Sequence, residues 1–248
     1  MKIKYFKLKI ILILTLLCIS KNLYADKTYF DLSQDEINIK TNFTGQELIL
    51  FGIVEQGNDV IMIVKGPNKN FTVRNKKRIL GFWFNTKSVI YADIPSVFFI
   101  SSSKEINEIL NDEEIFKEKL SFNSIQFIPI NNKDLFIDLT EWNESLIRIQ
   151  KQNNLFKEFD LKIIDGKLFQ SRLYFPSNIP TGKYNVDIYQ IKNHEILSSS
   201  SKYIKVDKSG IGNTIYTFAK NESILYGIFA IVIAVFFGIF GALIFRKL

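Results

Sequence analysis

The sequence predicts a mainly β body, an immunoglobulin-like β-sandwich of one or two modules with short amphipathic helices, followed by one C-terminal transmembrane helix. Three observations predict this fold class. Short apolar runs of strand length alternate with turn residues through the middle of the chain. The N-terminus combines lysines with a short apolar stretch. A long uncharged apolar segment lies next to the C-terminus.

The N-terminus has the composition of a secretory signal peptide over residues 1–25. Its basic region contains Lys2, Lys4, Lys7 and Lys9. The apolar stretch Ile10–Ile19 is too short to cross about 30 Å of hydrocarbon, and Ala25 is a small residue at the cleavage position. An uncleaved N-terminal anchor is the alternative. Lipid modification of Cys18 is disfavoured because Leu17, rather than a small residue, precedes it.

The C-terminus predicts a membrane-spanning helix over residues 223–245. No charged residue occurs from Ser223 to Phe245, and the length suits a spanning helix of roughly 20 residues. Arg246 and Lys247 follow directly, and positive residues remain on the cytoplasmic side. We therefore expect an exported body, a stem over 209–222, the span, and a cytoplasmic tail at 246–248.

The basic composition comes from the two ends of the chain. The protein has 32 Lys and Arg against 25 Asp and Glu, a net charge of +7. Five of the lysines precede residue 26 and two cations follow residue 245, which leaves 25 basic and 25 acidic residues between. A neutral exported body disfavours nucleic acid as a partner. Cys18 is the only cysteine, so the mature chain can form no internal disulfide.

The first half of the body, residues 26–130, predicts a β-rich module. Leu48–Val54 and Val60–Val64 are apolar on both faces, as in central strands, and the turn-rich link Glu55–Asp59 has the length of a hairpin loop. Further short strands are expected at Phe71–Val73, Phe82–Phe84, Ser88–Ala92 and Val97–Ser101. The acidic run 112–114 is either a carboxylate site or the first turn of a helix, where negative charge is favourable.

The second half, residues 131–208, predicts an amphipathic helix followed by strands. Trp142, Leu146 and Ile149 have helical spacing, which predicts a helix over 141–155. The polar face of this helix is expected to contain Arg148, Gln150 and Lys151.

Turn signals then define the last strands. Asp165-Gly166 predicts a hairpin turn. Apolar residues alternate with polar ones from Tyr184 to Ile188, as in a half-buried strand. The segment Pro180-x-Gly182-x-Tyr184 is typical of the corner that enters a late strand of immunoglobulin-like modules.

The chain offers few groups for catalysis, and we expect no enzyme, no cofactor and no metal site. His194 is the only histidine, lies in an expected turn, and has no mature cysteine to join it as a zinc or copper ligand. The short glycine motifs lack the strand–turn–helix context of a phosphate-binding loop. A carboxylate-only site stays open, because any two acids can meet in a fold.

Two features are candidates for binding. In the span, Ala230, Ala234, Gly238 and Ala242 recur every four residues and predict a flat helix-packing face. Small residues are also common in spans generally. In the body, "VRNKKRILGFWFN" puts a basic run next to aromatic residues. Arg74, Lys76, Lys77, Arg78 and Trp83 are the candidates for contact with lipid headgroups, a partner or a small anion. The alternative is a charged hairpin whose Trp83 packs in the sandwich.

Several segments resemble one family. They are "FTGQELILFG", "VIMIVKGP", "RNKKRILGFWFN", "IPSVFFISSS" and "RLYFPSNIPTGKYNVDIY", followed by the stem and span. Together they resemble an uncharacterised transmembrane protein family of alphaproteobacteria. The resemblance implies a single-pass protein of the bacterial inner membrane with its body in the periplasm, and it implies no known activity. The resemblance also implies a gene that lies near genes for sulfite-exporter-type (TauE/SafE) transporters, as genes of this family often do.

We therefore expect a membrane-tethered periplasmic accessory or interaction subunit, whose partners are the bilayer and another membrane protein. That protein is either a TauE/SafE-type transporter or a second copy bound through the transmembrane helix. The alternative is a periplasmic anion-binding or sensing module.

Overall fold

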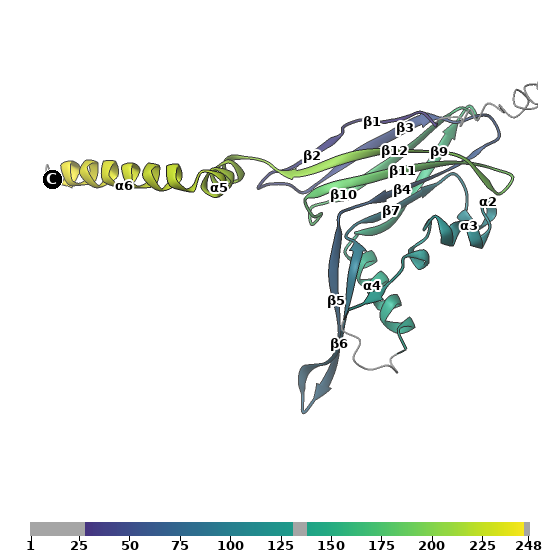
Figure 1. The fold of residues 1–248 in the computed structure, drawn as a ribbon, viewed down its shortest axis with the longest axis horizontal. Coiled ribbons are helices and arrows are strands. Elements are labelled where there is room, and N and C mark those ends of the chain that lie inside the picture. Colours follow the sequence, from purple (N-terminus) through teal and green to yellow (C-terminus); the bar gives the residue numbers. More distant parts are fainter. Residues whose placement is uncertain (1–27, 131–137, 246–248) are drawn as a thin grey trace, which may run out of the picture.

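The computed structural model describes residues 28–130 and 138–245. The expected signal peptide, residues 1–25, lies outside the described residues, as does the tail at 246–248. The described chain has three parts (Figure 1): a curled β-sheet, a hairpin and helices beside one face of that sheet, and a long C-terminal helix. The prediction of a mainly β protein with a C-terminal apolar helix is confirmed.

Nine strands form one sheet in the order β1-β3-β10-β9-β7-β4-β11-β12-β2. Their bounds are β1 Phe30–Leu32, β2 Glu36–Ile39, β3 Gly45–Ile53, β4 Asp59–Lys65, β7 Phe98–Ser102, β9 Phe156–Ile164, β10 Leu168–Pro176, β11 Gly182–Lys192 and β12 Glu195–Lys208. Strands from both halves of the chain alternate within this order. A three-stranded sheet is separate, in the order β5-β6-β8, with bounds β5 Asn68–Ile79, β6 Phe82–Pro95 and β8 Ile128–Pro129.

Strand β9 joins the two parts of the large sheet, β1-β3-β10 on one side and β7-β4-β11-β12-β2 on the other. Its first part pairs in parallel with β7, from Phe98↔Phe156 onward, and its last part pairs antiparallel with β10, as in Ser171↔Leu161. The result is one curled half-barrel. The expected immunoglobulin-like sandwich is therefore not confirmed, because β9 connects what would be two separate facing sheets.

The inside of the curl is filled by apolar side chains from most strands of the sheet. Fully buried members of this cluster include Leu48, Leu50, Met62, Val64, Phe99, Phe169, Phe175, Tyr184, Val186 and Ile204. The Phe175 ring lies 5.2 Å from Phe99 and 6.0 Å from Tyr184, centroid to centroid, with edge-on geometry. Aromatic packing thus holds β7, β10 and β11 together across the inside of the curl.

A second apolar cluster covers the outer face of the sheet around β4, β7 and β11. It is formed with the base of β5 and β6 and with short helices: α2 Ile106–Ile109, α3 Asp112–Lys117, the 3-10 turn η1 Phe122–Ser124, and α4 Thr140–Gln152. Because both faces of β4 are covered, Ile61 and Met62 are fully buried in different clusters. The predicted central position of this strand is confirmed.

Strand β3 differs from its prediction. Its side chains alternate, with Leu48 and Leu50 buried but Phe51 and Ile53 exposed, so only one face is covered. Nor does Glu55–Asp59 close a hairpin. Strand β3 pairs with β1 and β10, whereas β4 pairs with β7 and β11. The link crosses from one part of the curl to another, which loop length alone cannot distinguish from a hairpin.

The amphipathic helix predicted over 141–155 is present as α4, but the face that it buries is not the predicted one. It spans 140–152 rather than 141–155. Leu146 is buried, but Gln150 is buried as well, and Ile149 is exposed. The Gln150 side chain was expected on the exposed polar face. The face of α4 that packs against the body instead contains Gln150 and not Ile149. The acidic run occupies the first turn of α3, which agrees with the structural interpretation of those residues.

The expected turns of the second half are confirmed. Asp165 and Gly166 both have positive φ, at 50° and 64°, and connect β9 to β10. Tyr184 enters β11 fully buried, and its hydroxyl donates to the Pro180 carbonyl oxygen at 2.7 Å. The Pro-x-Gly-x-Tyr segment thus forms a corner at the start of β11, as expected, and its hydrogen bond is that of a tyrosine corner.

The stem is helical. Helix α5 Ile211–Asn221 follows the sheet, Glu222 leaves the helical conformation, and α6 Ser223–Phe245 continues to the C-terminal side. The rings of Phe218 and Tyr226 meet edge to face at 5.9 Å across this break. The span predicted at 223–245 coincides with α6, which is long and apolar enough to cross a membrane.

Candidate functional site: an exposed hairpin and a small-residue helix face

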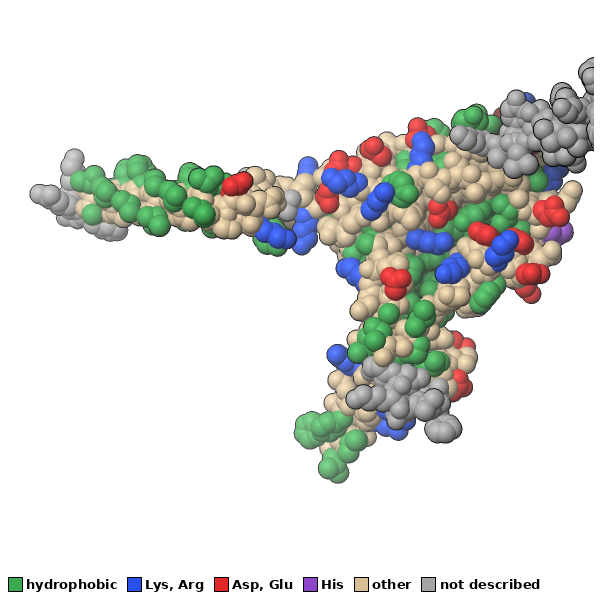
Figure 2. Space-filling model, in the orientation of Figure 1, with side chains coloured by type: hydrophobic (Ala, Val, Ile, Leu, Met, Phe, Trp, Pro, Cys, Tyr) green, Lys and Arg blue, Asp and Glu red, His purple; other side chains and the backbone are tan. Residues whose placement is uncertain are grey.

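The outer part of the β5–β6 ribbon, residues 74–88, projects away from the body (Figure 1). We call it the tip hairpin. The last buried pair on the ribbon is Val73↔Val89, and every residue from Arg74 to Ser88 is exposed. Seven residues per strand at 3.3 Å each give a projection of about 20 Å. Figure 2 shows apolar side chains gathered at its end.

Alternation along the strands gives the tip hairpin two different faces. Arg78 is paired with Trp83, while Ile79 is paired with Phe82 and Lys77 with Phe84. Side chains two residues apart share a face. One face therefore has Arg74, Lys76, Arg78 and Trp83. The other face has Lys77, Ile79, Phe82 and Phe84.

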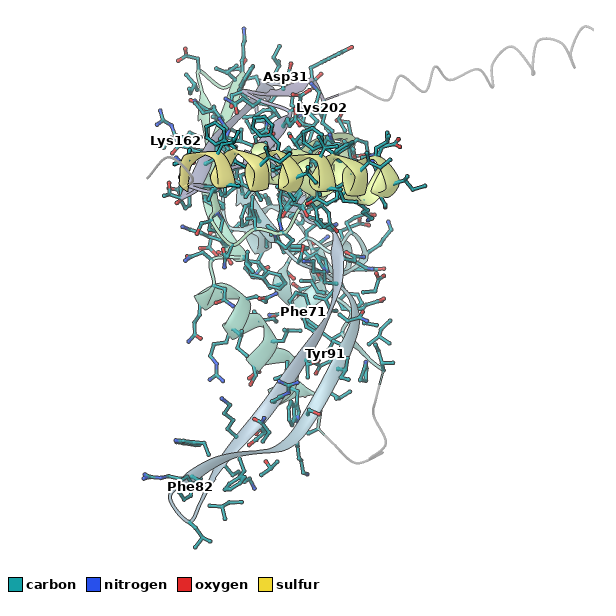
Figure 3. All side chains as sticks on the ribbon, turned by 90° about the vertical axis from the view of Figure 1, so that its left-hand side faces the viewer. Asp31, Phe71, Phe82, Tyr91, Lys162 and Lys202 are labelled. Carbon is teal, nitrogen blue, oxygen red and sulfur yellow. The ribbon has the colours of Figure 1, made fainter. Side chains whose placement is uncertain are left out.

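Four of the five predicted contact residues thus lie together, and Lys77 lies on the opposite face. The opposite face is continuous with the core. Nearer the body the same face presents Phe71, Val73 and Tyr91, which pack in the second cluster beside α4. Figure 3 shows Phe71 and Tyr91 at the base of the ribbon and Phe82 at its end. A face that is buried near the body therefore continues outward as exposed aromatic surface.

The turn at the end of the hairpin contains an unfavourable residue. Leu80 has φ 51° and Gly81 has φ 88°, so both central turn residues are left-handed. Asn, Asp and Gly suit these positions, whereas Leu is disfavoured by its Cβ. Leu80 is 95% exposed, so no packing within the protein compensates for its conformation. Strain of this kind concentrates at functional positions.

From the apolar part of this site, sequence reasoning named only Trp83 as a contact. It placed Trp83 and its neighbours either in contact with a ligand or packed in the body, and the packed alternative is wrong because Trp83 is 68% exposed. The apolar and basic residues of the tip hairpin that were not named as contacts are Ile79, Leu80, Phe82, Phe84 and Lys87. The available signal was the absence of any acid from residue 74 to residue 88 around a Leu-Gly turn. The predicted break between Phe82–Phe84 and Ser88–Ala92 is instead a register shift at Thr86, opposite Asn75 and Lys76, within the single strand β6.

The small residues of α6 lie on one side of that helix. At 100° per residue, Ala230, Ala234, Gly238 and Ala242 fall within an arc of about 120°, together with Gly227 and Gly241. Beyond the neighbouring backbone of α6 itself, a methyl group added at any of these three glycines would meet no atom within 4 Å. Within the described part of the chain, nothing packs against this face.

A polar groove of about 580 Å³ lies between the ends of β7 and β9 and the turn η1. Its cations already contact partners inside the protein. The Lys104 ammonium lies 2.9 Å from an Asp59 carboxylate oxygen, and Lys151 lies 3.9 Å from Glu158 and 4.4 Å from the Phe122 ring centroid. The groove therefore presents a largely compensated charge to any ligand.

The remaining polar candidates are surface or buried structural groups. His194 is exposed and forms the β11–β12 turn with Asn193, both at positive φ. Among residues 28–130 and 138–245, no three His, Cys, Asp or Glu side chains come together as metal ligands. Burial raises the pKa of the Tyr184 hydroxyl. Burial, followed by the nearby Asp187 and Glu118 carboxylates, raises the pKa of Tyr189 to about 12.

In the described residues, a β body is joined to one helix that is long and apolar enough to cross a membrane, which fits a single-pass membrane protein. Comparison with known proteins gives the family. The family model described as "Putative transmembrane protein (Alph_Pro_TM)" matches residues 27–247, and the chain belongs to this family. The resemblance found in the sequence is thereby confirmed. The comparisons gave no match to a curated protein and none to a solved structure.

Proposed function

We propose that this protein is a non-enzymatic accessory or interaction subunit, tethered in the bacterial inner membrane by α6 and bound there to another membrane protein. In this proposal the signal peptide exports the curled body into the periplasm and the tail at 246–248 stays in the cytoplasm. The Tyr184 corner supports an immunoglobulin-like origin for the body, which we include in the proposal.

The uncovered small-residue face of α6 is the main observation behind this proposal. In a bilayer, helices associate where small residues allow the two backbones to approach closely, because lipid provides no hydrophobic drive of its own. Six small residues within one arc form such a face, and no described part of this chain occupies it. A sulfite-exporter-type transporter is the first partner class to test, and a second copy of the chain is the other.

The test is purification of the tagged full chain from membranes in mild detergent, with mass spectrometry of what accompanies it. We expect one polytopic protein at near-equal amount, and we expect Gly238→Leu to remove it. Phe236→Leu is the matched control, since Phe236 lies on the opposite side of α6. If only the protein itself is recovered, and Gly238→Leu migrates as the unmodified chain does, no helix partner exists and the proposal fails.

The alternative, an anion-binding or sensing module, has weaker support. Its five residues do not converge on one point, because Lys77 lies across the ribbon from Arg74, Lys76 and Arg78. Thermal unfolding with millimolar sulfite, sulfate, thiosulfate or phosphate tests it directly. Stabilisation by one anion, beyond what chloride gives at equal ionic strength, would favour this function over the accessory role.

A further inference from the structure

We infer that the tip hairpin, residues 74–88, is a second membrane anchor that inserts its apolar end into the interface of the same anionic bilayer that α6 spans. The inference uses the membrane tether and not the identity of the protein partner. It therefore stands or falls separately from the proposed accessory role.

The composition of the tip hairpin is that of an interfacial anchor. Its end exposes Ile79, Leu80, Phe82, Trp83 and Phe84, with exposed fractions from 47% to 95%. Its flanks add the cations Arg74, Lys76, Lys77, Arg78 and Lys87, and no acidic residue occurs between 74 and 88. Aromatic and aliphatic side chains enter the boundary between headgroups and acyl chains, while Lys and Arg remain at the phosphates.

The positions of the two residue types match the depth profile of a membrane surface. The apolar residues occupy the turn, one position next to it on β5 and three positions next to it on β6. Arg78 and Lys77 pair with Trp83 and Phe84, and the other three cations lie further back along the ribbon. Insertion of the turn to a depth of about 5–10 Å would therefore bury the aromatic rings and leave Arg74, Lys76 and Lys87 at headgroup level. The long side chains of Lys77 and Arg78 can extend back to the same level. Arg78 lies closest to the turn, and its Nε donates to the Gly81 carbonyl oxygen at 3.2 Å.

The turn geometry supports a lipid contact. A flat ribbon about 20 Å long has few side chains with which to shape a pocket for a small ligand. Leu80 at the extreme end, in a left-handed conformation and 95% exposed, has no role in packing the body. Lipid tails accept a protruding apolar side chain in any orientation. Burial of the Leu80 side chain in lipid would therefore offset the conformational cost of its left-handed backbone.

Both anchors can reach one bilayer if the body turns relative to α6, and the helix break at Glu222 is a place where the chain can turn. In Figure 1 the ribbon projects clear of the sheet and runs across the direction of α6, with its end bent toward the side on which α6 lies. The tether by α6 keeps the tip hairpin at a high effective concentration near one membrane surface, so even weak insertion would be populated. Anionic lipids would add attraction to the five cations, and this part would weaken with salt.

The full chain contains two tryptophans, and each can serve as a reporter. Trp83 is in the tip hairpin, and Trp142 is in α4 on the body. Trp142→Phe leaves Trp83 as the only reporter, and Trp83→Phe leaves Trp142 as the matched control. Both full-length variants would be placed in nanodiscs containing phosphatidylglycerol and phosphatidylcholine with brominated acyl chains, which quench a tryptophan only on contact with the lipid tails.

We expect bromine to remove most of the Trp83 emission, with a blue shift, and to leave Trp142 emission unchanged. Leu80→Asn with Phe82→Ser should restore the Trp83 emission. Discs of phosphatidylcholine alone should give less quenching, and the difference should shrink as salt is raised. Trp83 that stays unquenched by bromine but is quenched by aqueous iodide would overturn the inference. In that case the tip hairpin is free in discs that contain no other protein, and the surface belongs to a protein partner.

Discussion

At the scale of single residues, the buried tyrosine at the start of β11 has an interaction that can be measured. The Tyr184 hydroxyl donates to the Pro180 carbonyl oxygen from a fully buried position. The Tyr174 hydroxyl makes a similar bond to the Thr44 carbonyl oxygen at 2.9 Å, but its side chain is 43% exposed. Comparison of Tyr184 with Tyr174 separates the contribution of burial to stability from that of the hydrogen bond itself.

We predict that Tyr184→Phe lowers the free energy of unfolding by about 1–3 kcal/mol, because the bond starts from a fully buried side chain and the half-buried Pro180 carbonyl loses its donor. Tyr174→Phe should cost about 1 kcal/mol or less, since water can reach the freed carbonyl. Denaturant titration of the full chain in detergent, followed by circular dichroism, measures both. Equal effects of the two substitutions would contradict the structure at this corner.

The same strand gives a prediction for alkaline pH. The pKa of Tyr189 is raised to about 12 by burial and by the Asp187 and Glu118 carboxylates, whereas an unfolded tyrosine titrates near pH 10. The folded state therefore holds this proton more tightly than the unfolded state. Stability from this source is fully present below about pH 10 and is lost as the pH rises toward 12.

We expect the unfolding midpoint of the full chain to be steady from pH 8 to about pH 10 and to fall above it. Tyr189→Phe should flatten the fall, because phenylalanine has no proton to lose; Tyr203→Phe, an exposed residue at 51%, should not. Denaturant midpoints at several pH values provide the measurement. An identical slope in both variants would show that other groups control the alkaline limit.

At the scale of elements, a substitution in the hairpin turn should affect the stability of the fold and the attachment to membranes in different ways. Asn is favoured over Leu at a left-handed turn position, so Leu80→Asn should leave stability unchanged or raise it by up to about 1 kcal/mol. The same change should weaken attachment of the tip hairpin to membranes. Thermal unfolding and the bromine experiment together measure the two effects. A clear loss of stability would mean that Leu80 packs against something after all.

The elements that could be predicted from sequence are those with strong local signals. The span at 223–245, the Asp165-Gly166 turn, the buried strand β4 and the Tyr184 corner depend on composition or spacing within a few residues. Pairing partners could not be predicted. Nothing in residues 45–53 indicates that β3 joins β10 more than a hundred residues later, because register depends on the whole sheet.

The candidate site was found only in part for the same reason. A basic run beside aromatics is visible in the sequence, but exposure is not. Phe82 and Phe84 have the composition of a core strand, and only the length of the β5–β6 ribbon places them beyond the supporting helix. Conversely, Gln150 is polar yet buried, because α4 rests on the body through that side.

At the scale of the whole molecule, β4 connects the two apolar clusters. Ile61 faces the outer cluster and Met62 the inner one, and both are fully buried. We predict that Ile61→Ala and Met62→Ala each destabilise the body by about 2–5 kcal/mol. Each should do so in one cooperative transition, with circular dichroism and Trp142 fluorescence coinciding. Separate transitions would show two modules that unfold independently.

The strand order also sets a time order for folding. The partners Leu48 and Leu173 lie in β3 and β10, and Met62 and Ile188 lie in β4 and β11. Such distant contacts close slowly, and the later strands are synthesised only just before α5 and α6. The early strands therefore remain without their pairing partners, with strand edges and apolar side chains exposed, until almost the entire chain has been synthesised. A nascent chain of this protein depends on protection from aggregation until its last strands arrive.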